Sequence, residues 1–406
     1  MTATGVVWDP VYLEHVTDDG HPDHPRRLKP LYRRLQDPLV NSRFTTIAPP
    51  AATDEEILLV HSPSYLNQVK ATATCPASAL SADTLTCDRS YPVAAKAVGG
   101  TIEAIRQVVA GTLSRALVLA RPPGHHAERT RAMGYCIFNN VAIGSMVART
   151  AMGLARVMVV DWDLHHGNGT QHMFERDPSV FFFSSHQFPH YPGTGHFTET
   201  GQGPGEGTTM NVPLSRGCGD GEFVAIYQRL LTPVVRAFEP QLILVSAGFD
   251  IHAADPLGGM KATPAGFAGL TRLILDIARQ TCAGRVVFCL EGGYHPDALA
   301  DSALAMIDEL TGRTCTDVDA MAAGADPGRL NTLVNRYAAA KREYEDGDDE
   351  TPEVNFLAVA ERKIFVRGLR RAFHAVQQQH LVAGVDQRMD AFGHHRRAAG
   401  NRGRCE

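Results

Sequence analysis

The chain has 406 residues, of which 44% are hydrophobic and 20% charged, an ordinary composition for a globular protein. The formal net charge is −5, so the chain lacks the basic character that nucleic-acid binding requires. The 8 cysteines are scattered and form no CxxC pair, so the sequence indicates neither a disulfide framework nor a structural zinc knuckle. With no long apolar run and no leader-like N-terminus, we expect a soluble, cytoplasmic protein that binds neither membranes nor nucleic acid.

Strand-like and helix-like segments alternate along the chain. Short buried runs predict strands at 5–8, 116–120, 180–184, 242–246 and 286–290, and the apolar start of the stretch 158–170 predicts another. Apolar residues at helical spacing predict helices at 28–35, 94–110, 141–149, 223–238 and 267–281, and Thr53 with Glu56 has the spacing of a capping box. Such alternation favours an α/β protein with a mainly parallel sheet.

The remaining segments set the domain boundaries. Residues 75–89 are rich in Ser, Thr and Ala without a clear period, and we expect a long surface loop there. We place one domain at 1–345. Residues 346–406 are expected to be an acidic linker followed by a helical or disordered extension, with an amphipathic pattern at 356–382.

Polar residues follow each buried run at the point where the run ends. They comprise His125 and His126, Asp163 and His165, residues 184–186, Asp250 and His252, and residues 291–294. Ligands of open α/β sheets bind beyond the carboxyl ends of the strands, so these segments are expected to meet in one crevice.

The stretch 158–170, MVVDWDLHHGNGT, carries the clearest chemical signal. If strand alternation continues, Asp161, Asp163 and His165 share one face. Crowded carboxylates need a cation, and Asp163, His165 and Asp250 form the best set of ligands for zinc or a similar divalent ion. His252 is a rival ligand, although an exposed loop histidine is the favoured interpretation of this residue. Asp161 could instead orient a histidine or bind a monovalent cation.

The tandem histidines and a tyrosine supply groups for hydrolysis. One imidazole of His125 and His126 could take a proton from a water at the metal while the other stays charged or bonded to a carboxylate. Tyr294, after two glycines, could donate to an oxyanion. The plainer readings, a surface histidine pair and a packing tyrosine, remain open on these residues alone.

Taken together, four segments resemble the signature sequences of the histone deacetylase family, which has the arginase–deacetylase fold. They are RPPGHHAERTRAMGYCIFNN, DWDLHHGNGT, SAGFDIHAADPLGG and LEGGY, within residues 5–312. The resemblance implies a single three-layer α/β/α domain with an eight-stranded sheet. Trp162 and Asn168 resemble the class II and bacterial deacetylase-like amidohydrolase branch.

The resemblance also implies roles, position by position. Zinc would be held by Asp163, His165 and Asp250. His126 would act as general base and then acid, His125 would pair with Asp161, and Tyr294 would polarise the acyl carbonyl. The substrate would meet the backbone carbonyl of Gly134 and the tunnel walls Tyr135 and Tyr191. Structural potassium would be held by Asp161, Asp163, His165, Ser184 and Ser185, and a second potassium ion by Phe174, Asp177 and Val180.

Two positions depart from related branches. Asn168 stands where class I members have an acid beside the second histidine, so the protonation of His126 should differ. Leu257 stands where polyamine-specific members carry a glutamate, which weakens the attraction for a cationic acetylpolyamine.

The resulting hypothesis is a zinc-dependent deacetylase that hydrolyses acetyl-lysine or another short-chain N-acyl amine. An acetylpolyamine or small-amide amidohydrolase is one alternative, and a non-catalytic acyl-lysine-binding scaffold is another. A dimanganese ureohydrolase of the arginase type is disfavoured because the residues after Asp163 offer no bridging aspartates. The sequence leaves a homo-oligomer open.

Overall fold

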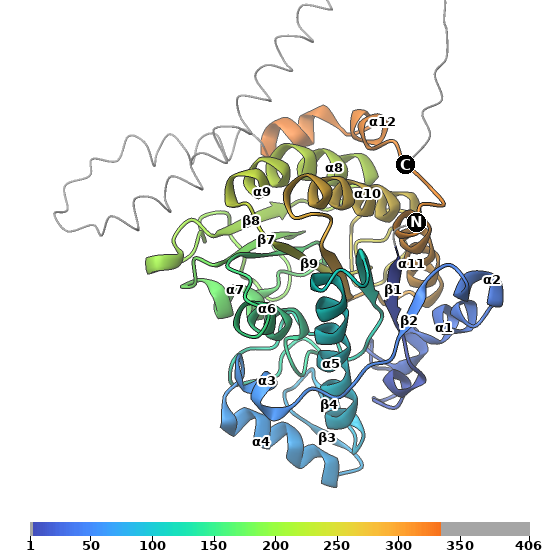
Figure 1. The fold of residues 1–406 in the computed structure, drawn as a ribbon, viewed down its shortest axis with the longest axis vertical. Helices are drawn as coiled ribbons and strands as arrows, with labels where there is room; N and C mark the ends of the chain where they lie inside the picture. The colour runs from blue at the N-terminus through green and yellow to red at the C-terminus, as the bar shows by residue number, and fades with distance from the viewer. Residues whose placement is uncertain (1–2, 334–406) are drawn as a thin grey trace, which may run out of the picture.

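The computed structural model describes residues 3–333, and residues 1–2 and 334–406 lie outside that description (Figure 1). Its centre is an eight-stranded sheet with the order β2-β1-β5-β10-β9-β6-β7-β8. The strands are β1 (Thr4–Val7), β2 (Thr45–Ile47), β5 (Arg115–Val118), β6 (Val157–Asp161), β7 (Val180–Gln187), β8 (Thr209–Leu214), β9 (Leu242–Ala247) and β10 (Val286–Leu290). Every neighbouring pair is parallel, so the expected α/β class and eight-stranded sheet are confirmed.

Helices cover both faces of the sheet and complete three layers (Figure 1). One layer contains α3 (Asp54–Leu58), α4 (Pro63–Ala71), α5 (Ser90–Val109), α6 (Asn140–Thr150) and α7 (Asn168–Phe174). The opposite layer contains α1 (Lys29–Leu35), α8 (Asp220–Ile226), α9 (Thr232–Phe238), α10 (Pro264–Thr281), α11 (Pro296–Leu310) and α12 (Val318–Ala323), and the short α2 (Pro38–Asn41) follows α1. Among the described residues, none of these helices is long and apolar enough to cross a bilayer.

The strands are apolar almost throughout because both faces of the sheet are covered. Strands β6, β9 and β10 are buried at every position. A parallel sheet packed between two helical layers has this pattern rather than alternation. The polar side chains of the predicted site gather near the carboxyl ends of the strands, as Asp161 does in β6 and residues 184–187 do in β7.

Two helices differ from a simple helical pattern for local reasons. Helix α5 contains Gly99 and Gly100, and a Cβ atom on Gly99 would lie 2.1 Å from the Pro50 carbonyl oxygen, so the helix packs closer than alanine would allow. The predicted helix at 223–238 is divided into α8 and α9 by a π-helical turn, Tyr227–Leu231. This turn carries the Tyr227 hydroxyl to Ser185 on β7.

Several elements were not predicted from the sequence. The strands β2 and β8 form the two sheet edges, where Thr45–Ile47 is short and β8 includes Pro213. The region 75–89 is not only loop, since β3 (Ser78–Ala79) and β4 (Leu85–Thr86) pair in antiparallel fashion.

The capping box predicted for Thr53 and Glu56 is present at α3. The boundary at 345 and the predicted extension lie outside the described residues.

Candidate metal centre and active site

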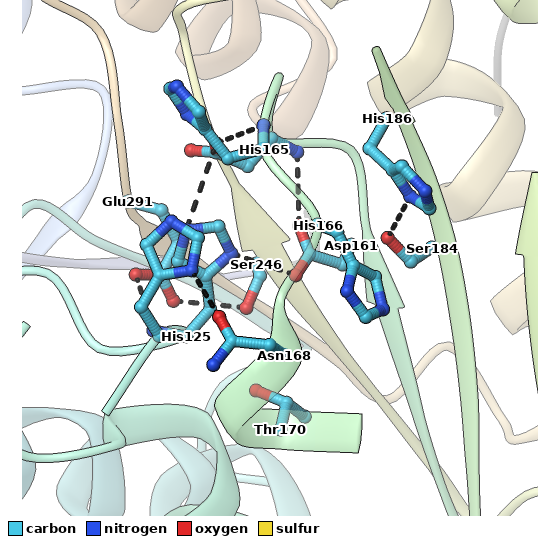
Figure 2. A network of polar contacts seen from close by, with 12 residues as sticks. His125, Asp161, His165, His166, Asn168, Thr170, Ser184, His186, Ser246 and Glu291 are labelled. Carbon is cyan, nitrogen blue, oxygen red and sulfur yellow. Dashed lines mark hydrogen bonds and ion pairs between the residues drawn. The ribbon is translucent and has the colours of Figure 1, made fainter. Parts of the chain in front are cut away.

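Residues from two strand ends meet at the predicted metal centre. Asp163 and His165 follow β6 and Asp250 follows β9, and their candidate ligand atoms all lie within 4.8 Å of one another. His165 Nδ1 lies 3.1 Å from Asp163 Oδ1 and 3.1 Å from Asp250 Oδ2. All three side chains are buried. In Figure 2, His165 lies at the top of the network of polar contacts.

The geometry after β6 differs from the expected strand alternation. The strand ends at Asp161, and the next residues turn. Asp161 Oδ1 accepts the backbone N–H of Asp163 at 3.0 Å, and Asp163 Oδ1 accepts that of His165 at 2.8 Å. Carboxylates bonded to the amide two residues ahead stabilise such turns. These bonds, rather than the pleat of a strand, keep Asp163 and His165 on the same side.

Backbone amides hold the carboxylates in position. Gly292 N–H donates to Asp163 Oδ2 at 2.8 Å, and Leu164 N–H donates to Asp250 Oδ1 at 2.9 Å. Each carboxylate thus has one oxygen fixed by the backbone and the other beside His165. A Cβ atom on Gly292 would lie 2.2 Å from Asp250 Oδ2 and 2.6 Å from Asp163 Oδ2, so only glycine fits there.

These residues fit a zinc ion. Two carboxylate oxygens and one imidazole nitrogen are three ligands of the kinds that zinc takes in catalytic sites. Burial, followed by the charge of Asp163, raises the pKa of Asp250 to about 7. Burial opposes a charge on His165, yet its bonds to both carboxylates raise its pKa to about 10. The group therefore favours a positive charge at its centre, as a divalent cation would provide.

The tandem histidines lie beside this group in different environments. His125 Nδ1 lies 3.0 Å from Asp161 Oδ2, and the neighbouring carboxylates raise the pKa of His125 to about 10 against the opposing effect of burial. His126 Nδ1 instead lies 2.7 Å from the amide oxygen of Asn168. Burial and the charge of His125 hold the pKa of His126 well below its usual value. The surroundings therefore favour the charged form of His125 and the neutral form of His126.

Glu291 fixes the loop that carries the histidines. One of its oxygens accepts the backbone N–H groups of Gly124 at 2.6 Å and His125 at 3.1 Å, and the other accepts the Ser246 hydroxyl at 3.0 Å (Figure 2). His125, Cys136 and Glu291 also lie close enough to hold a metal ion. Because the Glu291 oxygens already accept these three bonds, this second group has a structural explanation without a metal.

Three tyrosines of the predicted site make ring contacts. The Tyr191 ring lies 5.2 Å from that of His126 and 6.0 Å from that of His165, between ring centroids. The Tyr294 ring lies 5.8 Å from that of Tyr135, and burial raises the pKa of its phenol, which stays protonated. Tyr191 therefore lies beside two of the site histidines, and Tyr135 and Tyr294 pack against each other.

Gly134 and Leu257 lie at the same end of the sheet. Gly134 has a positive φ of 57°, and a Cβ atom there would lie 2.3 Å from His126 Cδ2, so the backbone passes directly beside that ring. Leu257 N–H donates to Asp255 Oδ1 at 3.0 Å, while Asp255 Oδ2 accepts the Tyr294 N–H at 2.6 Å. His252 lies outside the ligand group, and its ring stacks on Phe267.

The predicted potassium segments are also brought together. Asp161 on β6 is in register with Ser184 on β7, and the Ser185 hydroxyl lies 2.8 Å from that of Tyr227. At the second predicted site, Asp177 N–H donates to the Phe174 carbonyl at 2.8 Å and Val180 N–H donates to the Asp177 carbonyl at 3.3 Å. Potassium binding at either place stays a prediction.

Sequence reasoning missed a buried ionic group beneath the site. Arg27 donates to Asp23 Oδ1 at 2.6 Å and to the carbonyls of Glu291 and Gly293, both at 2.6 Å. Arg121 donates to both oxygens of the same aspartate. The sequence HPDHPRR could have indicated this group, because it places charged residues among prolines that rule out an ordinary helix. Two further missed residues, Asp83 and Glu128, bond to Tyr191 and Asn168.

The fold and the site together define a class. An all-parallel eight-stranded sheet in three layers, with two carboxylates, an imidazole and tandem histidines at its strand ends, is the arrangement expected of the arginase–deacetylase fold. The "Crystal Structure of HDA15 HD domain" matches with a TM-score of 0.77 and 32% identity, covering 90% of this chain and 99% of that one.

Sequence comparison supplies the family. The model of the "Histone deacetylase domain" matches residues 21–310. "Histone deacetylase 5" of Arabidopsis thaliana is 38% identical over 325 residues, 75% of this chain and 48% of that protein. "Polyamine deacetylase HDAC10" of Homo sapiens is 39% identical over 324 residues, 77% of this chain and 47% of that protein. The chain thus spans about half the length of these relatives. It belongs to the histone deacetylase family.

Proposed function

We propose that this protein is a zinc-dependent deacetylase that hydrolyses the amide of acetyl-lysine or of another short-chain N-acyl amine. The observation that carries the proposal is the convergence of Asp163, His165 and Asp250, whose ligand atoms lie within 4.8 Å of one another. They lie beside two histidines, of which His125 is bonded to Asp161 and His126 to Asn168. The names of related proteins, which are histone and polyamine deacetylases, support the same reaction.

Zinc bound by these three ligands would supply Lewis-acid polarisation of water and of the acyl carbonyl. His126 takes the proton of the attacking water on Nε2, since Nδ1 is bonded to Asn168. It then gives that proton to the leaving amine, so the carbon–nitrogen bond breaks and a carboxylate and an amine are released. His125, charged through Asp161, stabilises the negative charge that develops nearby.

Tyr294 is the second donor to the developing oxyanion. Its phenol is protonated because burial raises its pKa, and the Arg27 guanidinium lies 4.7 Å from its ring centre. Neutral donors placed where charge develops are effective in water-poor sites. The two tyrosine rings at 135 and 191 would wall the acyl chain, and the Gly134 carbonyl would accept the substrate N–H.

Acetylpolyamine hydrolysis is the second candidate, favoured by the 39% identity to a human polyamine deacetylase. Leu257 argues against it, because this apolar side chain offers no carboxylate to a distant ammonium group. The binding of potassium near Ser184 and Ser185, and the cytoplasmic location, remain parts of the proposal.

A substrate panel tests the proposed function. The purified full-length chain, loaded with zinc, is incubated with acetyl-, propionyl- and butyryl-lysine peptides, N-acetylputrescine, N8-acetylspermidine and acetamide, and the released carboxylate is measured. We expect release from acyl-lysine peptides that stops on zinc chelation and in His126→Ala. Release from acetylpolyamines alone would establish the second candidate. No release from any substrate would refute the enzymatic proposal and favour an acyl-lysine-binding scaffold.

A further inference from the structure

The side chain of Asn168 connects the neutral histidine to a carboxylate. Its amide oxygen lies 2.7 Å from His126 Nδ1, and its amide nitrogen lies 2.7 Å from Glu128 Oε1. The Met133 sulfur lies 3.5 Å from the same nitrogen. Asn168 and His126 are almost fully buried, whereas the Glu128 side chain is 13% exposed. A hydrogen-bonded chain therefore extends from the active site toward the surface.

The chemistry of these groups fixes the direction of every bond in the chain. An ionised carboxylate only accepts hydrogen bonds, so the group of Asn168 that faces Glu128 must be the NH₂. The amide oxygen then faces His126, and an amide oxygen also only accepts. His126 Nδ1 must therefore carry the hydrogen, which leaves the lone pair on Nε2.

The carboxylate itself is held firmly. Glu128 Oε1 also accepts from His172 Nδ1 at 2.8 Å, and these bonds lower the pKa of Glu128 although burial opposes the charge. Its backbone N–H donates to the Arg131 carbonyl at 3.0 Å, and its own carbonyl lies 3.0 Å from His61 Nδ1. Asn168 and His172 stand four residues apart on α7, on one helix face. Glu128 thus joins that face to the loop that carries the histidines.

We propose that Glu128 is a positioning residue for the deacylation reaction: by accepting from the amide of Asn168, its carboxylate selects the tautomer of His126 that can act as a base at Nε2. The inference rests on the proposed function and deepens it. Glu128 does not contact the reacting atoms, and the intervening amide passes no proton, so its effect is on the orientation of a neighbour. Without the carboxylate, Asn168 can rotate and offer its NH₂ to His126, which stabilises the wrong tautomer.

Three substitutions at Glu128 separate this role from general support of the fold. Glu128→Ala removes the acceptor of the Asn168 amide. Glu128→Asp keeps the negative charge, but its side chain is one methylene group shorter, so the carboxylate lies farther from that amide. Glu128→Gln keeps an oxygen that can accept from Asn168. We expect kcat on an acetyl-lysine peptide to fall roughly 10- to 100-fold in the first two with KM within about twofold, and Glu128→Gln to recover to within about threefold of the original chain. Arg131→Ala, which removes an exposed partner 3.8 Å from Glu128, is the matched control and should change kcat by less than about twofold.

The tautomer of His126 is read directly by ¹⁵N NMR of zinc-loaded protein with labelled histidines, with the His126 signals identified from their loss in His126→Ala. We expect a protonated Nδ1 and an unprotonated Nε2 in the original chain and in Glu128→Gln, and a mixed or reversed pattern in Glu128→Ala and Glu128→Asp. Should Glu128→Ala fail to fold, Glu128→Asp decides the question. Unchanged His126 signals together with kcat within twofold in the folded variants would overturn the proposal. If the original chain hydrolyses nothing, the proposed function fails, while the NMR pattern still tests the positioning role.

Discussion

Gly292 donates its backbone N–H to Asp163 Oδ2 at 2.8 Å, although 129 positions separate the two residues in the chain. The bond joins the end of β10 to the loop after β6, strands that are separated in the sheet by β9. Asp250, which follows β9, completes the group. The site therefore depends on three neighbouring strand ends, because the candidate ligands follow β6 and β9 and Gly292 follows β10. The close packing of this glycine against the carboxylates is part of the site.

Gly292→Ala should reduce zinc binding without unfolding the protein. The new methyl group would lie 2.2 Å from Asp250 Oδ2, so the carboxylates must shift. We expect zinc affinity to fall by roughly 10-fold or more, measured by competition with a chromogenic chelator. Gly20→Ala, which adds a methyl group with nothing within 4 Å, is the control and should bind zinc normally. Equal zinc affinity in both variants would show that the packing of Gly292 against the carboxylates does not affect zinc binding.

Tyr294→Phe removes only the phenol oxygen. If the hydroxyl donates to the developing oxyanion, kcat should fall by roughly 10² to 10³ while KM changes little, since the bond strengthens only in the transition state. Steady-state kinetics on an acetyl-lysine peptide measure both constants. An unchanged kcat would reassign Tyr294 to packing against Arg27 and Tyr135.

Tyr191→Phe tests how the acyl group is accommodated. The Tyr191 hydroxyl donates to Asp83 Oδ2 at 3.0 Å, and this bond restrains a ring that is 39% exposed. Without the hydroxyl, the ring is no longer held by this hydrogen bond, and its edge is apolar. We expect the ratio of propionyl to acetyl kcat/KM to rise roughly fourfold, the equivalent of about 0.8 kcal/mol for the one CH₂ group by which these acyl chains differ. Asp83→Asn, which retains an acceptor for the hydroxyl, should shift the ratio less. The same ratio in all three proteins would exclude this restraint as a determinant of acyl length.

Stability should fall with acidity below about pH 6.5, in part through His61. Its Nδ1 lies 3.0 Å from the Glu128 carbonyl, and its Nε2 accepts the Asn139 N–H at 3.0 Å, so the ring must be neutral in the fold. Burial lowers its pKa from 6.5 to about 4. Between these values the unfolded chain binds a proton that the folded chain does not, so folding becomes less favourable as pH falls, by up to about 3 kcal/mol at pH 4.

Urea unfolding of chelated protein between pH 7.5 and 4.5 measures this effect. His61→Gln should be less stable than the original chain at pH 7.5, but its free energy of unfolding should decline less steeply with acidity, so the two proteins converge. His196→Gln, altered at a partly exposed ring, should keep the original slope. If the free energy of unfolding declined equally steeply with acidity in His61→Gln and in the original chain, His61 would not contribute to this pH dependence.

Much of the fold was predictable because buried parallel strands are continuous apolar runs. The run at 286–290 matches β10 in both bounds. The edge strand β8 was missed because Asn211 and Pro213 interrupt its apolar run. An edge strand tolerates such residues, whereas a central strand does not. The short β2 gives too little pattern to distinguish it from loop.

The candidate site was predictable to the extent that its residues stand directly after those runs, as Asp163 and Asp250 do. Asp23, Asp83 and Glu128 could not be placed in the same way, because they reach the site through loops whose course depends on tertiary contacts. Asp83 and Glu128 bond to Tyr191 and Asn168, which the pattern did identify. Asp23 bonds to Arg27 and Arg121, which it did not. Spacing along a chain reveals groups that share an element, whereas partners supplied across the fold require coordinates.

The most direct test of the central claim is anomalous X-ray scattering at the zinc edge from crystals of the zinc-loaded protein. We expect one strong peak within bonding distance of Asp163, His165 and Asp250, about 2.0 to 2.2 Å from each ligand atom, and its loss in Asp250→Ala. A peak between His125, Cys136 and Glu291 instead, or strong zinc retained at the first position in Asp250→Ala, would contradict it.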